Sequence, residues 1–186
     1  GGTKQTSETA SDEKSIEISS VTIDPAQSMV IWSGTMLGVY THEGTLDLTK
    51  AELSMADGRI TGGSFTADMN SMVATDENYN PEQGSTPEKL VGHLKSADFF
   101  DVENYPEATF VITGAGDNSV SGMMTIRGIT HEETVENVMM SKEGDKVKIT
   151  GDMTIDRKKY NVSWDSPVAE RVLSNDLVLK IELLGT

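Results

Sequence analysis

Apolar and polar residues alternate with a period of two through most of the chain from Ile16 onward, as in strands that bury one face. The alternation is cleanest between residues 146 and 155, and it recurs in shorter stretches. These stretches lie at about 28–34, 39–48, 51–56, 59–70, 109–113, 119–127 and 172–184, with a long mixed stretch at 129–140. About eight strands that follow one another, each with one apolar face, predict an antiparallel barrel or a sandwich.

Turn residues separate these strands. Asp57-Gly58 stands between two alternating stretches and predicts a tight hairpin. Gly116-Asp117-Asn118 and Gly144-Asp145 mark two further hairpins in the second half. Most strands are therefore expected to pair with the strand that follows them.

Residues 73–105 interrupt the strand pattern. A polar loop at 73–86 leads to Ser85-Thr86-Pro87-Glu88, which has the spacing of a capping box with Pro near the first turn. Leu90 and Leu94 follow on one face of a short helix that ends near Ser96, and a second turn is expected at Phe99-Phe100. The chain thus predicts one or two short helices across one opening of a barrel.

Length and composition fit one domain at 15–186, preceded by a flexible polar leader at 1–14. No run approaches the roughly 20 apolar residues of a transmembrane helix. The net charge of −15 argues against nucleic acid and anionic membrane surfaces as partners. The chain has no Cys, so it has neither disulfides nor thiolate chemistry.

Catalytic and metal-binding patterns are weak. His42, His93 and His131 stand on separate predicted elements without the spacing of metal ligands. Asp98 and Asp101 form a carboxylate pair, yet their position around two Phe residues fits turn ends better than acid–base catalysis. No Gly-x-Ser-x-Gly nucleophile motif is present. We therefore expect no enzyme activity, no metal and no cofactor.

Two features near strand ends have alternative interpretations. Arg157, in Asp156-Arg157, could orient a phosphate or carboxylate head group with its fork of donors, or form an ion pair that fixes the next loop to the barrel rim. The second interpretation is favoured. Trp32 and Trp164 could pack the barrel ends or contact a ligand, and the polar surroundings of Trp164 place it at a rim.

Several motifs occur in a fixed order from about Ser20 to the C-terminus. They are Trp32-Ser33-Gly34, His42-Glu43-Gly44, Gly63-x-Phe65, Asp68-Met69-x-Ser71, HLKSADFFD from His93 to Asp101, YPEATF from Tyr105 to Phe110, Gly122 through Ile126-x-Gly128-x-Thr130, and Ile155-Asp156-Arg157. In these motifs and their spacing the chain resembles the YceI-like, polyisoprenoid-binding family. The HLKSADFFD string carries most of the specificity.

The resemblance implies an all-β fold, an extended, lipocalin-like antiparallel barrel of eight strands whose pore holds a long isoprenoid or fatty-acid-like lipid. It also implies a periplasmic or envelope location and a homodimer. The polar leader at 1–14 is of a kind that often follows a lipid-anchored cysteine in bacterial envelope proteins, so a lipid anchor is expected in the full-length protein. The loop at 73–86 carries no obvious ligand contacts.

The aligned apolar faces admit two interpretations, a filled core and a ligand pore, and the resemblance favours the pore. Phe100 is expected to anchor the helical segment rather than to face the ligand. The residues expected to contact a ligand are Trp32, His42, Leu46, Phe65, Met69, Leu90, Leu94, Phe99, Phe110, Ile112, Val120, Met124, Ile126, Val147, Ile149, Met153, Ile155, Leu177, Leu179 and Ile181. A filled-core structural or protein-interaction module of the cell envelope is the alternative function.

Overall fold

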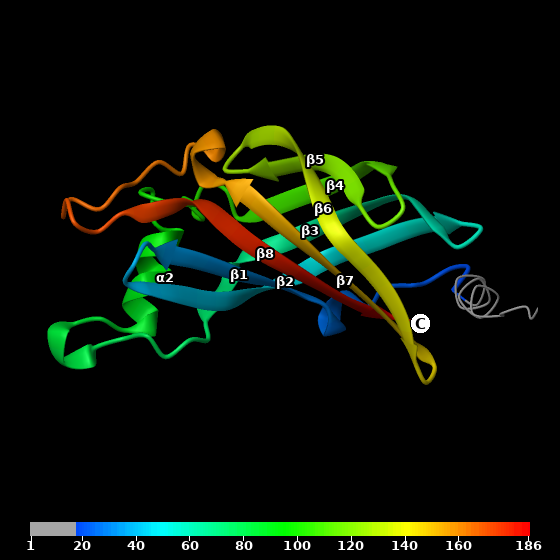
Figure 1. Cartoon of the computed structure of the whole chain (residues 1–186), viewed down its shortest axis with the longest axis horizontal. Helices are drawn as coiled ribbons and strands as arrows, with labels where there is room; N and C mark the ends of the chain where they lie inside the picture. Colours follow the sequence, from blue (N-terminus) through cyan, green and yellow to red (C-terminus); the bar gives the residue numbers. More distant parts are fainter. Residues whose placement is uncertain (1–17) are drawn as a thin grey trace, which may run out of the picture.

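The computed structural model describes residues 18–186, and the predicted leader at 1–14 lies outside this range. Eight strands form one closed barrel, drawn in Figure 1. The strands are β1 (Met29–Met36), β2 (Tyr40–Ala56), β3 (Arg59–Ala74), β4 (Glu107–Ala115), β5 (Val120–Ile126), β6 (Ile129–Glu143), β7 (Lys146–Asp156) and β8 (Leu173–Gly185). One α-helix, α2 (Pro87–Lys95), and three 3₁₀ turns, η1 (Pro25–Gln27), η2 (Pro81–Gln83) and η3 (Arg157–Tyr160), complete the described part.

Each strand pairs antiparallel with the next, and β8 pairs with β1 to close the ring. Closure satisfies the backbone groups that an edge strand would leave unpaired. The prediction of an all-β, eight-stranded antiparallel barrel is confirmed.

Strand β2 is longer than the sequence predicts. The stretches 39–48 and 51–56 form one continuous strand because Thr49 is an extra residue in the pairing with β3, between Leu48↔Ala67 and Lys50↔Thr66. A bulge of this kind shifts the alternation by one residue. The inward face therefore passes from Leu48 to Ala51, a shift that reads as a strand break in the sequence.

A similar irregularity explains the mixed pattern of β6. Its register with β7 shifts between Glu136 and Met139, and Asn137 adopts a left-handed φ of 52°. Val135 and Val138 therefore both face inward although three positions separate them. Asn tolerates this backbone conformation better than most residues.

The predicted Asp57-Gly58 hairpin is confirmed. Asp57 and Gly58 both have positive φ, at 54° and 77°, as a type I′ turn requires. Arg127 and Gly128, with φ of 49° and 73°, make the same kind of turn between β5 and β6.

Helix α2 begins one residue later than the predicted capping box implies. Thr86 is the N-cap, and its Oγ1 accepts a hydrogen bond from Lys89 N at 3.2 Å, with Pro87 at the first helical position. The predicted Ser85–Glu88 pairing is wrong, because Glu88 stands too early in the first turn for the reciprocal bond. Figure 1 shows α2 across the end of the barrel where β1 meets β2, as the sequence predicts.

The opposite end is closed by the start of the described chain. Ile18, Val21 and Ile23 are buried there against Val147 and Leu183. Backbone hydrogen bonds between Thr22 and Thr186, in both directions at 2.8 and 3.0 Å, fasten this segment to the end of β8. Apolar side chains of the segment at 18–23 therefore fill the end of the barrel opposite α2.

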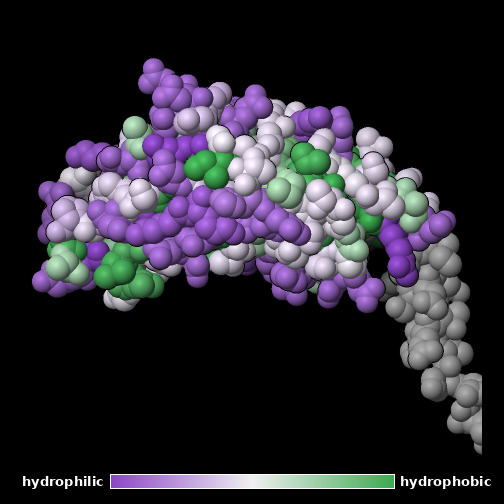
Figure 2. Space-filling view, turned by 90° about the horizontal axis from the view of Figure 1, so that it is seen from above, coloured by the Kyte–Doolittle hydropathy of each residue, from purple (hydrophilic) through white to green (hydrophobic). Residues whose placement is uncertain are grey.

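The outer surface is mainly polar in the view of Figure 2, as the strand alternation predicts. A hydrophobic group is visible at the left end of that view, the end that carries α2 and the β1–β2 turn. Four aliphatic side chains at this end are about half exposed: Leu37, Val39, Val168 and Val172. The β1–β2 turn and the segment before β8 are adjacent, because Leu37 N donates to Val172 O at 2.8 Å.

Candidate ligand-binding site

The barrel interior contains a cavity of about 340 Å³. All eight strands, α2, the segment after α2 and the segment between β7 and β8 contribute to its wall, which is almost entirely apolar. Pockets that hold small molecules start at about 300 Å³ and combine an apolar lining with a few polar groups. The interior of this barrel therefore has the size and chemistry of a ligand pocket.

The cavity wall contains every side chain expected from the sequence to contact a ligand, with one exception. Val147 does not line the cavity. Its side chain is buried with Ile18, Val21 and Leu183 at the filled end of the barrel. The alternation placed Val147 on the inward face correctly, but it could not reveal that the N-terminal segment fills this end.

Sequence reasoning missed other parts of the wall. Phe100 lines the cavity beside Phe99, so the expectation that it only anchors the segment is wrong. Trp164, placed at a rim, also lines the cavity and packs edge-on against the His93 ring at 4.9 Å between ring centroids. Leu53 and Met72 were missed because bulges change the phase of β2 and β3 before these residues.

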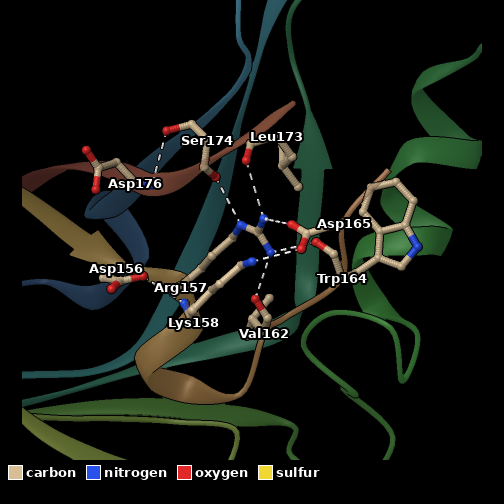
Figure 3. Close-up of polar contacts among 9 residues, drawn as sticks. All are labelled: Asp156, Arg157, Lys158, Val162, Trp164, Asp165, Leu173, Ser174 and Asp176. Atoms are coloured by element: carbon tan, nitrogen blue, oxygen red, sulfur yellow. Dashed lines mark hydrogen bonds and ion pairs between the residues drawn. The ribbon is translucent and has the colours of Figure 1, made fainter. Parts of the chain in front are cut away.

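Arg157 is the one residue with a permanent charge in the cavity wall, among residues 18–186, and its side chain is fully buried. Figure 3 shows its guanidinium surrounded by acceptors. Nε donates to Ser174 O at 3.0 Å, and Nη1 donates to Val162 O and Trp164 O at 2.8 and 2.7 Å. Nη2 donates to Asp165 Oδ1 at 3.0 Å and to Leu173 O at 3.4 Å.

These bonds use all five guanidinium donors, so Arg157 holds the segment after η3 to the start of β8. The loop-fixing interpretation therefore fits the structure, although the ion-pair partner is Asp165 and not the neighbouring Asp156. Asp156 instead accepts a hydrogen bond from Lys158 N at 3.0 Å (Figure 3). Hydrogen bonds from Lys158 and Arg157 lower the pKa of Asp165.

His42 lies at the α2 end of the cavity, and the Asp76 carboxylate contacts its ring from outside the cavity wall. Its Nδ1 lies 2.8 Å from Asp76 Oδ2, and its ring stacks on Tyr79 at 4.7 Å between centroids and tilts against Tyr40 at 4.6 Å. His42 and Tyr40 line the cavity, whereas Asp76 and Tyr79 do not. The loop at 73–86, from which no contacts were expected, thus supports the cavity wall through Asp76 and Tyr79.

The Asp76 carboxylate is held in its charged form. Burial raises the pKa of Asp76, but hydrogen bonds from Tyr79, His42, Glu43 N and Asn78 N outweigh that effect, so the pKa lies below its usual value. Burial and the neighbouring carboxylate raise the pKa of Tyr79 above its usual value. This loop therefore presents a fixed negative charge close behind His42.

The other two His residues have separate partners. His93 Nε2 lies 3.0 Å from Asp98 Oδ2, and His131 Nε2 lies 2.9 Å from Lys159 O. Within the part of the chain that the structure describes, no three His, Cys, Asp or Glu residues converge as metal ligands would. None of the described helices has the length and apolar character needed to cross a membrane.

Tyr160, the last residue of η3, forms a buried polar pair with Glu133 of β6. Tyr160, which is fully buried, donates its hydroxyl to Glu133 Oε2 at 2.7 Å. Burial and this carboxylate raise the pKa of Tyr160 above its usual value. The pair fastens η3 to β6 and is separate from the cavity wall.

Comparison with known proteins places the chain in a family. The YceI-like domain matches residues 21–184. BcnA of Burkholderia cenocepacia has the same fold, with a TM-score of 0.69 and 25% identity over 89% of this chain and 100% of that one. A polyisoprenoid binding domain from Saccharophagus degradans, implicated in plant cell wall breakdown, matches with a TM-score of 0.57 and 13% identity over 89% of this chain and 97% of that one.

Among curated proteins, a UPF0312 protein of Staphylococcus aureus (strain USA300) is 37% identical over 79 residues, which cover 39% of this chain and 46% of the relative. The chain thus matches about half the length of that relative. The family match, by contrast, extends from the segment before η1 to the end of β8 and includes every strand of the barrel. The chain therefore belongs to the YceI-like family.

Proposed function

We propose that this protein binds one long apolar molecule, a polyisoprenoid or a fatty-acid-like lipid, in its barrel cavity and sequesters or carries it without catalysis. The observation that carries the proposal is the closed barrel around an apolar cavity of about 340 Å³. The name of the Saccharophagus degradans relative, a polyisoprenoid binding domain of the same fold, supports the same class of ligand. All the residues predicted from the sequence to contact a ligand, except Val147, line this cavity, which supports the proposal.

A filled-core interaction module is the competing function. A barrel packed solid by its own side chains has no cavity above the size of a few water molecules. The cavity here exceeds the roughly 300 Å³ at which ligand pockets begin, so it favours the ligand carrier.

The binding energy would come from the chain of the ligand. Each buried methylene contributes about 0.8 kcal/mol, so a long hydrocarbon binds tightly with few polar contacts. Arg157 has no donor left for a head group, because its guanidinium donors are all bonded to backbone carbonyls and to Asp165. Affinity should therefore rise with hydrocarbon length until the chain fills the cavity.

Native mass spectrometry of the purified protein, followed by organic extraction, tests the proposal. We expect a co-purifying lipid of one class, or uptake of an added isoprenoid by the lipid-free protein. A protein that carries no lipid and takes up neither farnesol nor a fatty acid would refute it.

Adjacent residues of β7 offer a matched pair of variants. Met153 lines the cavity and is 3% exposed, whereas Thr154 is exposed on the outer face of the same strand. Met153→Glu should abolish uptake because it places a carboxylate against the hydrocarbon, and Thr154→Glu should leave uptake unchanged. Thermal unfolding of both variants separates loss of binding from loss of fold.

We also propose a periplasmic or envelope location and a homodimer, from the family resemblance, and a lipid anchor, from the polar leader. Cell fractionation of the native producer tests the location, and detergent phase separation tests the anchor. Sedimentation velocity of the purified protein tests the dimer.

A further inference from the structure

One end of the cavity carries polar side chains, whereas the rest of its wall is apolar, and these polar groups affect which ligand can bind. Near the α2 end, the wall contains Tyr40 and His42, with Asp76 and Tyr79 outside it. The His42 ring lies between the Asp76 carboxylate and the cavity, since Nδ1 contacts Asp76 and the side chain lines the wall. Asp76 occupies Nδ1, so Nε2 is the ring nitrogen that remains for a ligand in the cavity.

The hydrogen bonds around Asp76 determine what Nε2 can do. Asp76 accepts bonds from Glu43 N at 3.1 Å, Asn78 N at 3.2 Å and Tyr79 Oη at 2.7 Å, in addition to His42. A neutral imidazole that donates Nδ1–H to a carboxylate keeps its lone pair on Nε2. Within residues 18–186, no protein group hydrogen-bonds to His42 Nε2, so this acceptor is available to a ligand.

The charges at this end disfavour an anionic head group. A carboxylate or phosphate on the ligand would lie near Asp76, whose pKa is lowered and which therefore stays negative. The permanently charged cation of the described cavity wall, Arg157, has all its donors bonded to the protein. A buried anion without a counter-charge is strongly unfavourable.

We propose that His42, held in one orientation by Asp76 and Tyr79, accepts a hydrogen bond from the terminal hydroxyl of the ligand, and that the cavity selects long-chain alcohols over the matching acids. This inference rests on the proposed function, since it assumes that the cavity holds a long apolar chain. It adds that the apolar wall provides affinity while His42 provides selectivity for a neutral donor.

Three probes with the same isoprenoid chain test the selectivity: farnesol, farnesoic acid and farnesene. Each competes with a fluorescent apolar probe for the full-length protein. We expect farnesol to bind about three- to tenfold more tightly than farnesene, the effect of one hydrogen bond, and farnesoic acid to bind more weakly than farnesol.

Two variants assign the effect to the proposed groups. His42→Phe keeps an aromatic ring but removes the acceptor, so it should abolish the preference for farnesol over farnesene, measured as the ratio of the two affinities in the same variant. Asp76→Asn removes the negative charge and should raise the affinity for farnesoic acid relative to farnesol.

Asp98→Asn is the matched control for Asp76→Asn. It changes the same residue type beside another cavity-lining His, His93, but Asp98 has a side chain that is 59% exposed and therefore solvated. It should leave the order of the three probes unchanged.

The outcomes separate the two proposals. If none of the three probes binds, the proposed function fails and this inference fails with it. If all three bind equally, or if His42→Phe keeps the preference for farnesol, the inference alone is overturned. Tighter binding of the acid than of the alcohol by the unaltered protein would also overturn it. Farnesene binding by His42→Phe shows that the variant retains a folded cavity.

Discussion

Replacement of Arg157 by Met tests what a buried cation does in an apolar barrel. Met is unbranched and apolar and carries no charge, so the variant removes five hydrogen bonds while an apolar side chain still occupies part of the space. Four backbone carbonyls lose this donor, whereas Asp165 keeps its bond from Lys158. The Val162 carbonyl belongs to a residue that is 1% exposed and would stay buried, whereas Trp164, Leu173 and Ser174 are half-buried and can recruit water.

A buried acceptor without a partner costs about 1–3 kcal/mol, and acceptors that reach water cost less. We therefore expect Arg157→Met to lower the free energy of unfolding by about 3 kcal/mol. An opposite effect competes with this loss, because burying a guanidinium has a desolvation cost that an apolar residue avoids. Chemical denaturation with urea, followed by circular dichroism, measures the balance.

The control separates the carbonyl contacts from the ion pair. Asp165 is mostly exposed, so its pairing with Arg157 is screened by water, and Asp165→Asn should change stability little. If Arg157→Met is neutral or stabilising, or if Asp165→Asn costs as much as Arg157→Met, then Arg157 does not stabilise the barrel through the carbonyls.

Three further changes test other parts of the structure. Gly44→Ala should cost about 3 kcal/mol of stability in urea denaturation, because a Cβ there would overlap the Val73 carbonyl oxygen and the Trp32 ring. Val147→Ala should cost about 2 kcal/mol and leave ligand affinity unchanged, since Val147 lies beyond the cavity; a weaker affinity would contradict that placement. The folded-state pKa of Asp76 lies below its unfolded value. The stabilisation by the Asp76 carboxylate is therefore present above about pH 4 and is lost as the pH falls below that value. The difference in melting temperature between the unaltered protein and Asp76→Asn should shrink over that acidic range.

The barrel could be predicted from the sequence because its strands are half-buried. A strand with one face in the interior must alternate, and Met153 and Ile155 alternate with exposed Thr154 for that reason. The register within β2 could not be predicted in the same way. The bulge at Thr49 depends on pairing with β3, and no local pattern distinguishes it from a break between two strands.

The wall of the cavity was predictable and its ends were not. Inward-facing positions follow from alternation, but the extent of the cavity depends on which segments fill the barrel ends. Val147 lies at the filled end because residues 18–23 reach it across the chain. Trp164 reaches the cavity because Arg157 holds its carbonyl. Both contacts join residues that the sequence alone does not relate.

Two polar segments outside the strands determine which polar groups stand at the α2 end of the cavity. Residues 75–80 place Asp76 behind His42, and residues 161–172 are held over the interior by Arg157. A lining of strands alone would bind any hydrocarbon of suitable length, since burial of apolar surface does not depend on direction. Under the proposed function, selectivity for a head group would come from these segments, where directed hydrogen bonds and fixed charge lie next to the apolar wall. Under the proposed function we therefore expect changes in the two segments to alter the preferred head group while the barrel and its affinity for the hydrocarbon chain stay the same.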